Sequence, residues 1–155
     1  MAQLRNFIQP FYEKIGGTIA GFTNFLEDKV INHLFGGTSY TVPTTWYCGL
    51  LTASPSDSAS GTEVTGGAYA RQAISWTVTG TGTAQAASSA ALTWDAASSD
   101  WGTVTHAGIY DALTEGNICA FETLTKSDFT ESNPKTIDTG DIFKIDSGNL
   151  KVQLD

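Results

Sequence analysis

The sequence predicts a mainly β protein, an antiparallel β-sandwich or jelly-roll-like domain preceded by an N-terminal helical arm. Helical spacing of apolar residues is confined to residues 1–35, whereas short runs rich in β-branched and aromatic residues follow one another from Tyr40 onward. Segments rich in Gly, Ser, Asp and Thr separate those runs. We therefore divide the chain into an arm, residues 1–38, and a β-sandwich domain, residues 39–155. We expect only one domain with its own core, because 155 residues are the usual length of a single domain.

The first fifteen residues contain five large apolar side chains at helical spacing: Leu4, Phe7, Ile8, Phe11 and Ile15. Pro10 interrupts this pattern and Gly16-Gly17 end it, so we expect a kinked helix or a short helix followed by a turn. Large apolar side chains such as these are expected to be buried, either against their own domain or against a neighbouring subunit. We expect the neighbouring subunit and predict these five residues as partner-binding residues.

Residues 24–35 form the clearest predicted helix. Asn24 is the expected N-cap, and Glu27 completes a capping box with it. Gly36-Gly37 are expected to end the helix, and His33, which has no second metal ligand nearby, is interpreted as a partly exposed helix residue. The apolar stripe of this helix consists of Phe22, Phe25, Leu26, Val30, Ile31, Leu34 and Phe35.

The stretch Trp101–Asp111 predicts a central strand that is covered on both faces, because both of its alternating sets mix small, β-branched and aromatic residues. Alternation places Val104, His106, Gly108 and Tyr110 on one face. The predicted strands are Trp46–Leu51, Tyr69–Val78, Ala84–Trp94, Val104–Tyr110, Ile118–Leu124, Asp141–Ile145 and Leu150–Leu154.

The charge pattern argues against nucleic-acid and membrane partners. The formal net charge is −8, and the eight basic residues are scattered without forming a patch, so phosphate binding lacks its main source of energy. No run approaches the length of a membrane span, and no secretion signal is expected. Charged residues make up only 15% of the chain, and Thr, Ser, Ala and Gly provide a neutral surface suited to lying against other protein.

Cys48 and Cys119 fall inside predicted strands. Two buried free thiols are the favoured interpretation, because free cysteine is among the most buried residue types, and a disulfide between two sheets is the alternative.

Two arrangements invite a catalytic reading. Asp138-Thr139-Gly140 matches the triplet of aspartic proteases, but that reaction needs two such carboxylates and the chain contains one copy, so we interpret the triplet as a turn. His106 and Asp111 are unlike a base and its orienting carboxylate, because an odd separation of five residues places them on opposite faces of a strand.

No cofactor, metal site or enzymatic activity is therefore predicted. The two histidines lie on different elements, and no spaced Asp loop for calcium, phosphate-binding glycine loop or nucleophile elbow is present. Arg71 and Glu63 are expected to pair, within the domain or between protomers.

Several motifs occur in an order and spacing that match one family. They are Phe35-Gly-Gly-Thr-Ser-Tyr-Thr-Val-Pro43, Trp46-Tyr-Cys-Gly-Leu-Leu-Thr52, Gly61-Thr-Glu-Val64, Gly66-Gly-Ala-Tyr-Ala-Arg-Gln72, Trp101-Gly-Thr-Val-Thr-His106, Lys135-Thr-Ile-Asp-Thr-Gly-Asp141 and Leu150–Asp155. On these motifs, residues 24–155 resemble a widespread family of small tailed-bacteriophage virion proteins, labelled capsid cement (decoration) or tail-fibre-like proteins.

The resemblance implies a virion structural role without catalysis. A compact body with an apolar N-terminal arm and no repetitive shaft favours a capsid cement protein. Such a protein would bind the major capsid protein and stabilise the shell as a homo-oligomer, and a trimer is the natural expectation. The expected location is then the capsid surface, after assembly in the host cytoplasm. The alternative is a tail-fibre, baseplate or other tail-associated host-binding structural protein.

Overall fold

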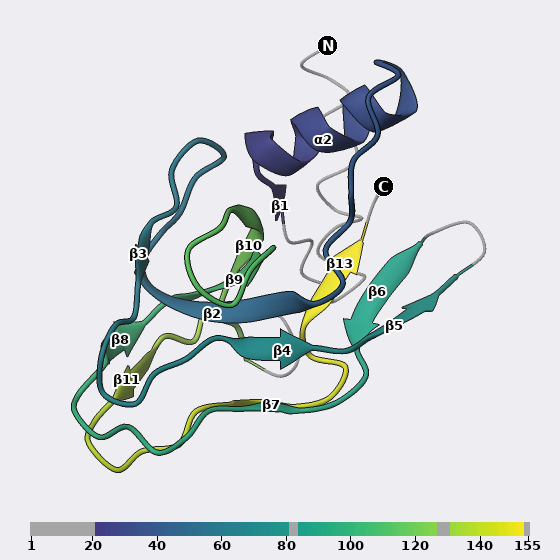
Figure 1. The fold of residues 1–155 in the computed structure, drawn as a ribbon. Coiled ribbons are helices and arrows are strands. Elements are labelled where there is room, and N and C mark those ends of the chain that lie inside the picture. Colours follow the sequence, from purple (N-terminus) through teal and green to yellow (C-terminus); the bar gives the residue numbers. More distant parts are fainter. Residues whose placement is uncertain (1–20, 81–83, 127–130, 154–155) are drawn as a thin grey trace.

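The computed structural model describes residues 21–80, 84–126 and 131–153, and it shows antiparallel sheets with one short helix near the N-terminal end of the described chain (Figure 1). The helix is α2 (Asn24–Leu34). The strands are β1 (Gly21–Phe22), β2 (Trp46–Ala53), β3 (Thr62–Glu63), β4 (Gln72–Ile74), β5 (Trp76–Thr79), β6 (Gln85–Ser88), β7 (Leu92–Thr93), β8 (Gly102–Val104), β9 (His106–Tyr110), β10 (Ile118–Thr123), β11 (Lys135–Ile137), β12 (Lys144–Ile145) and β13 (Lys151–Gln153).

The largest sheet has the strand order β1-β10-β9-β2-β3, with β4 also paired to β2. Smaller sheets pair β11 with β8, β12 with β7, and β13 with β6 and β5, and every pairing is antiparallel. No closed barrel forms among the described strands. The predicted mainly β, antiparallel fold with an N-terminal helix is confirmed.

The main core lies between the large sheet and the smaller ones. Leu50 on β2 and Ile109 on β9 bury against Leu92 on β7, Val104 on β8 and Ile137 on β11. A second cluster covers the opposite face of the large sheet and consists of Leu51, Tyr110 and Ile118 with Tyr47 and Phe121 packed against it. The large sheet is therefore covered on both faces, which explains the near-continuous apolar run at the centre of β2.

The single strand predicted over Trp101–Asp111 is wrong in one respect: the chain breaks at Thr105 into β8 and β9. Thr105 donates its backbone N–H to the carbonyl of Leu51 at 2.8 Å, and the two strands have different partners, β11 for β8 and β2 with β10 for β9. The break resets the alternation, so Val104 joins the main core whereas Tyr110 lies in the second cluster.

Two glycines make room for the Tyr110 ring. Gly49 and Gly108 face one another in the β2–β9 register. A Cβ atom on Gly49 would lie 2.7 Å from the Cε2 atom of Tyr110, and one on Gly108 would lie 2.9 Å from the same atom. The ring packs closely on the sheet because neither position has a side chain.

Two other long strand predictions also divide in the structure. The Tyr69–Val78 prediction becomes β4 and β5, and the Ala84–Trp94 prediction becomes β6 and β7. In the first case β4 pairs with β2 in the large sheet and β5 pairs with β6 in a separate sheet, so the chain changes layer at Ser75. The short strands β1, β3 and β11 were not predicted.

The capping box predicted for the helix is wrong. The N-cap is Thr23, whose hydroxyl donates to the carbonyl of Ile118 at 2.7 Å and makes no capping bond. Asn24 is already helical, and its backbone N–H donates to the carbonyl of Asp57 at 3.0 Å. Tertiary hydrogen bonds therefore replace the local cap. The predicted glycine stop is confirmed, because Gly37 takes a positive φ of 69° just after the helix.

No helix in the described ranges is long and apolar enough to cross a membrane.

Candidate functional site

The residues that invited a catalytic reading belong to turns and strand contacts. Asp138 donates its backbone N–H to the Oδ2 atom of Asp141 at 3.0 Å, and Asp100 accepts hydrogen bonds from the backbone N–H and hydroxyl of Thr139, each at 2.8 Å. This network is a turn, as predicted. The residues described contain no group of three side chains that is able to hold a metal ion.

His106 and Asp111 do not meet. The His106 Nδ1 atom lies 2.8 Å from the Thr105 hydroxyl and its Nε2 atom lies 3.2 Å from the Thr123 hydroxyl. Asp111 instead accepts hydrogen bonds from the backbone and side-chain N–H groups of Asn117, at 2.7 and 2.8 Å. Burial lowers the pKa of His106, which favours the neutral imidazole in this strand contact.

Arg71 and Glu63 form the predicted pair within one domain. The Arg71 Nε and Nη2 atoms donate to the two Glu63 carboxylate oxygens at 2.8 and 2.7 Å. The Nη1 atom donates to two loop carbonyls, those of Ala112 and Glu115, each at 2.7 Å. The guanidinium also lies 3.5 Å from the centroid of the Tyr110 ring. This cluster ties the loop after β9 to the edge of the large sheet, so its role is structural.

Cys48 and Cys119 are both free and buried, which confirms the favoured interpretation of the two cysteines. Burial raises the pKa of each thiol to about 12, so both remain protonated at neutral pH.

We expect neither thiol to react with a soluble aromatic disulfide reagent at pH 8 in the folded protein. A pKa of about 12 in place of roughly 8.5 lowers the thiolate fraction on the order of a thousandfold. The measurement is the rate of reagent release with and without urea, with the exposed position Ile142→Cys as a fast-reacting control. Rapid labelling of the unsubstituted folded chain would contradict the burial of these two residues.

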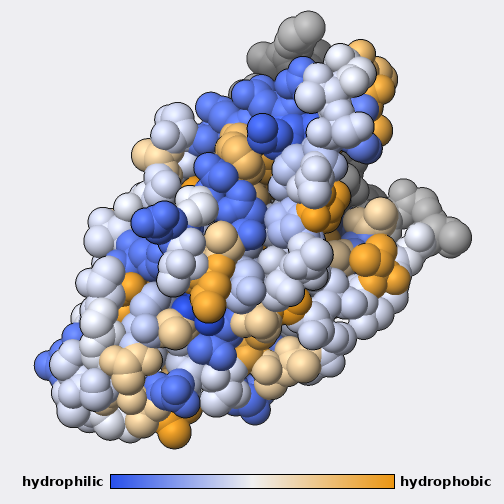
Figure 2. All heavy atoms as spheres, in the orientation of Figure 1, coloured by the Kyte–Doolittle hydropathy of each residue, from blue (hydrophilic) through white to orange (hydrophobic). Residues whose placement is uncertain are grey.

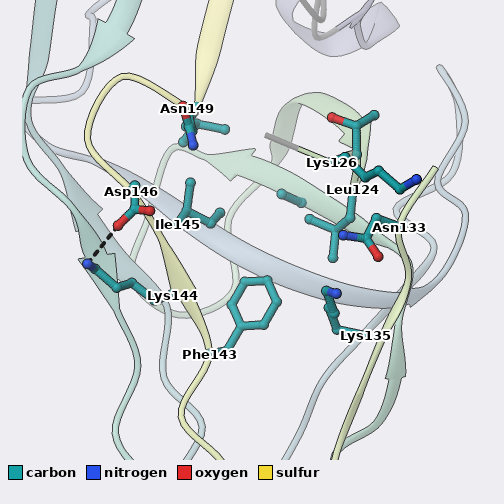
Figure 3. Close-up of a pocket in the computed structure, with 12 residues that line it drawn as sticks. Leu124, Lys126, Asn133, Lys135, Phe143, Lys144, Ile145, Asp146 and Asn149 are labelled. Atoms are coloured by element: carbon teal, nitrogen blue, oxygen red, sulfur yellow. Dashed lines mark ion pairs between the residues drawn. The ribbon is translucent and has the colours of Figure 1, made fainter. Parts of the chain in front are cut away.

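A small polar-rimmed pocket of about 240 Å³ lies between the end of β10 and the β12 region (Figure 3). Leu124, Phe143 and Leu150 are among its apolar lining residues. Its charged rim includes Lys126, which pairs with Glu131, and Lys144, which pairs with Asp146 at 2.6 Å. These pairs neutralise much of the local positive charge.

Three further polar side chains of this pocket, those of Lys135, Asn133 and Asn149, have no hydrogen-bond or ion partner within the described ranges. Together with the apolar lining, they are able to receive a small ligand that has one apolar face and hydrogen-bond acceptors.

A second hollow, about 270 Å³, is lined by apolar residues, and we call it the apolar groove. One wall comes from β1 and α2, the base from the large sheet, and the other wall from the β5–β6–β13 sheet. Its lining residues are Phe22, Leu26, Trp46, Trp76, Val78, Ala86, Ile109, Cys119, Ala120 and Val152.

Exposed apolar side chains continue beyond the apolar groove. Ile31, Leu34 and Phe35 at the end of α2 are 57%, 63% and 80% exposed, and Val42 and Val78 are 59% and 72% exposed. Figure 2 shows hydrophobic residues along the side of the molecule where the end of α2 and the β5–β6 hairpin lie. No residue of α2 is buried: Phe25, Leu26 and Val30 are half-buried, and Ile31 and Leu34 are exposed.

The predicted partner-binding residues Leu4, Phe7, Ile8, Phe11 and Ile15 lie outside the described residues. The apolar groove was not predicted. The sequence marks Phe22 and Leu26 as apolar stripe residues, but it contains no local signal that Trp46, Trp76 and Val152, from three different strands, face them.

Comparison with known proteins identifies the family. A family model described as podophage GP4 fiber I protein gp80 matches residues 21–153, which is most of the 155-residue chain. No curated protein matches the chain. The match covers the helix, the large sheet, the three smaller sheets and the apolar groove, and the family is one of non-enzymatic phage fibre structural proteins. The chain therefore belongs to the podophage GP4 fiber I protein gp80 family and is a structural component of a phage virion.

Proposed function

We propose that this protein is a tail-associated fibre subunit that works by assembling with other virion proteins. The observation that carries the proposal is the fibre-family match over residues 21–153. It supports the tail-associated alternative of the sequence analysis better than the capsid cement interpretation, in which the partner would be the major capsid protein.

The surface of the body supports an assembled state. Monomeric proteins rarely expose large contiguous apolar patches, and such patches mark interaction sites. Here the apolar groove and the exposed end of α2 provide apolar surface on one side of the body. A homo-oligomer that covers this surface, with the N-terminal arm as part of the contact, is the arrangement we propose.

The experiment that tests the location is immunogold labelling of intact virions with an antibody against the β domain. We expect gold at the tail, and no gold on particles assembled without this gene product. Gold spread over the head shell would overturn the tail location and support a capsid cement role instead.

A further inference from the structure

We propose that the apolar groove of each subunit receives the N-terminal segment, residues 1–15, of a second copy of this chain. The inference rests on the proposed function, because a fibre subunit meets its own copies during assembly. It names the contact that holds them together.

The groove and the segment match in chemistry. The groove is lined by apolar residues from α2, the large sheet and the β5–β6–β13 sheet. The segment carries the five apolar residues at helical spacing that the sequence analysis identified. An apolar cavity of about 150 Å³ holds one benzene-sized group, so a groove of about 270 Å³ has room for about two large side chains.

The apolar surface extends past the groove along the helix. Leu26, Val30 and Leu34 are spaced four residues apart and therefore lie on one face of α2. Leu26 lines the groove, whereas Leu34 is 63% exposed. An amphipathic segment placed in the groove is able to continue along this face and cover more apolar surface than two side chains alone.

The direction of the chain favours a neighbour's segment over the subunit's own. In the β1–β10 register Gly21 lies opposite Phe121 and Phe22 lies opposite Ala120. The chain therefore enters β1 from the Phe121 side, whereas the groove is lined by Ala120 and Cys119, the residues toward the opposite end of β10. A subunit fills its own groove only if its chain reverses shortly before Gly21, with Gly16-Gly17 as the available turn. A segment from a second copy has no such constraint.

The distribution of charge along the chain also favours contact between the N-terminal segment and a second copy. The charged residues among residues 1–20 are Arg5, Lys14 and Glu13, which give a net side-chain charge of +1. Since the whole chain has a net charge of −8, the remaining residues have a net charge of −9. Two bodies of that charge repel one another at low salt. A segment with slightly positive charge is the part of this chain best suited to approach another body.

The test is disulfide cross-linking between two full-length chains of different mass. One carries Phe11→Cys in the segment, and the other carries Val78→Cys at the groove, where the native side chain is 72% exposed. The matched control is Ile142→Cys, which is 64% exposed and lies outside the groove. Under mild oxidation we expect at least tenfold more mixed disulfide with Val78→Cys than with Ile142→Cys.

Equal yields with the two body positions would overturn the proposal. So would a doubly substituted chain, Phe11→Cys with Val78→Cys, that cross-links only within itself, because the segment would then occupy its own groove. The native thiols are buried, and the unsubstituted chain provides the background.

A second measurement does not depend on cross-linking. Phe11→Asp places a charge where the segment enters the groove, whereas Gln9→Asp adds the same charge at a polar position of the same segment. By light scattering we expect Phe11→Asp to weaken self-association roughly 30-fold, as for a central interface residue, and Gln9→Asp to leave it unchanged. Equal effects of the two substitutions, or none, would contradict the proposal.

The two hypotheses fail separately. Tail labelling without a selective cross-link overturns the segment contact and leaves the fibre location standing. A selective cross-link with labelling of the head shell overturns the tail location and retains the contact between copies.

Discussion

Replacing Trp94 with alanine is expected to lower the free energy of unfolding by about 3–5 kcal/mol, the usual cost of removing a buried Trp. The side chain is 1% exposed, and its ring packs edge-on against Phe143 with 5.4 Å between centroids. The backbone N–H of Trp94 also donates to the carbonyl of Phe143 at 3.0 Å. Because a domain of this size is stable by only about 5–15 kcal/mol, the variant is expected to lose a large part of its stability.

Urea unfolding followed by far-UV circular dichroism measures this loss. Trp94→Phe keeps an aromatic ring in the core and is expected to lose less. Val42→Ala, at a position that is 59% exposed, should change the free energy by less than about 0.5 kcal/mol. A Trp94→Ala midpoint equal to that of Val42→Ala would show that Trp94 does not hold the small sheets on the large one.

Replacing Arg71 with alanine is expected to cost about 3 kcal/mol, the lower end for breaking a buried ion pair. The side chains of Arg71 and Glu63 are only 7% and 23% exposed, so the substitution leaves the Glu63 carboxylate largely buried without its cation. It also removes the donor to the carbonyls of Ala112 and Glu115 and the packing over the Tyr110 ring. We expect the lower end of the range of unfolding free energies because water still reaches Glu63.

The matched control for Arg71→Ala is Lys144→Ala, which breaks an ion pair whose side chains are 52% and 67% exposed. That pair should contribute about 0–1 kcal/mol. Arg71→Lys keeps the charge but loses the two parallel bonds to the carboxylate, and it should fall between the two. If Arg71→Ala and Lys144→Ala cost the same in urea unfolding, the Arg71 cluster has no special role in stability.

The features that depend on local pattern are predictable from the sequence. The mainly β pattern after Tyr40, the free cysteines and the turn at Asp138-Thr139-Gly140 are confirmed, whereas the strands predicted over Tyr69–Val78, Ala84–Trp94 and Trp101–Asp111 each divide in two. The Arg71–Glu63 pair is confirmed within one domain.

The features in which a tertiary hydrogen-bond partner competes with a local one are not predictable from the neighbouring residues. Thr23, rather than Asn24, occupies the N-cap position, and its hydroxyl makes no capping bond but donates to the carbonyl of Ile118, 95 residues away along the chain. Thr105 breaks a continuous strand pattern because its N–H donates to Leu51 on another strand. Nothing in the neighbouring residues signals either bond.

By itself the sequence determined the fold class and the place of the helix, since both follow from spacing and residue type along the chain. Only the tertiary structure decided which strands share a sheet, that no residue of α2 is buried, and that Trp46, Trp76 and Val152 join Phe22 and Leu26 around one groove. The physical reason is that a groove is a property of surfaces brought together from distant segments. Local patterns determine which apolar side chains each segment has on one face, and tertiary packing alone determines which other segments those side chains contact.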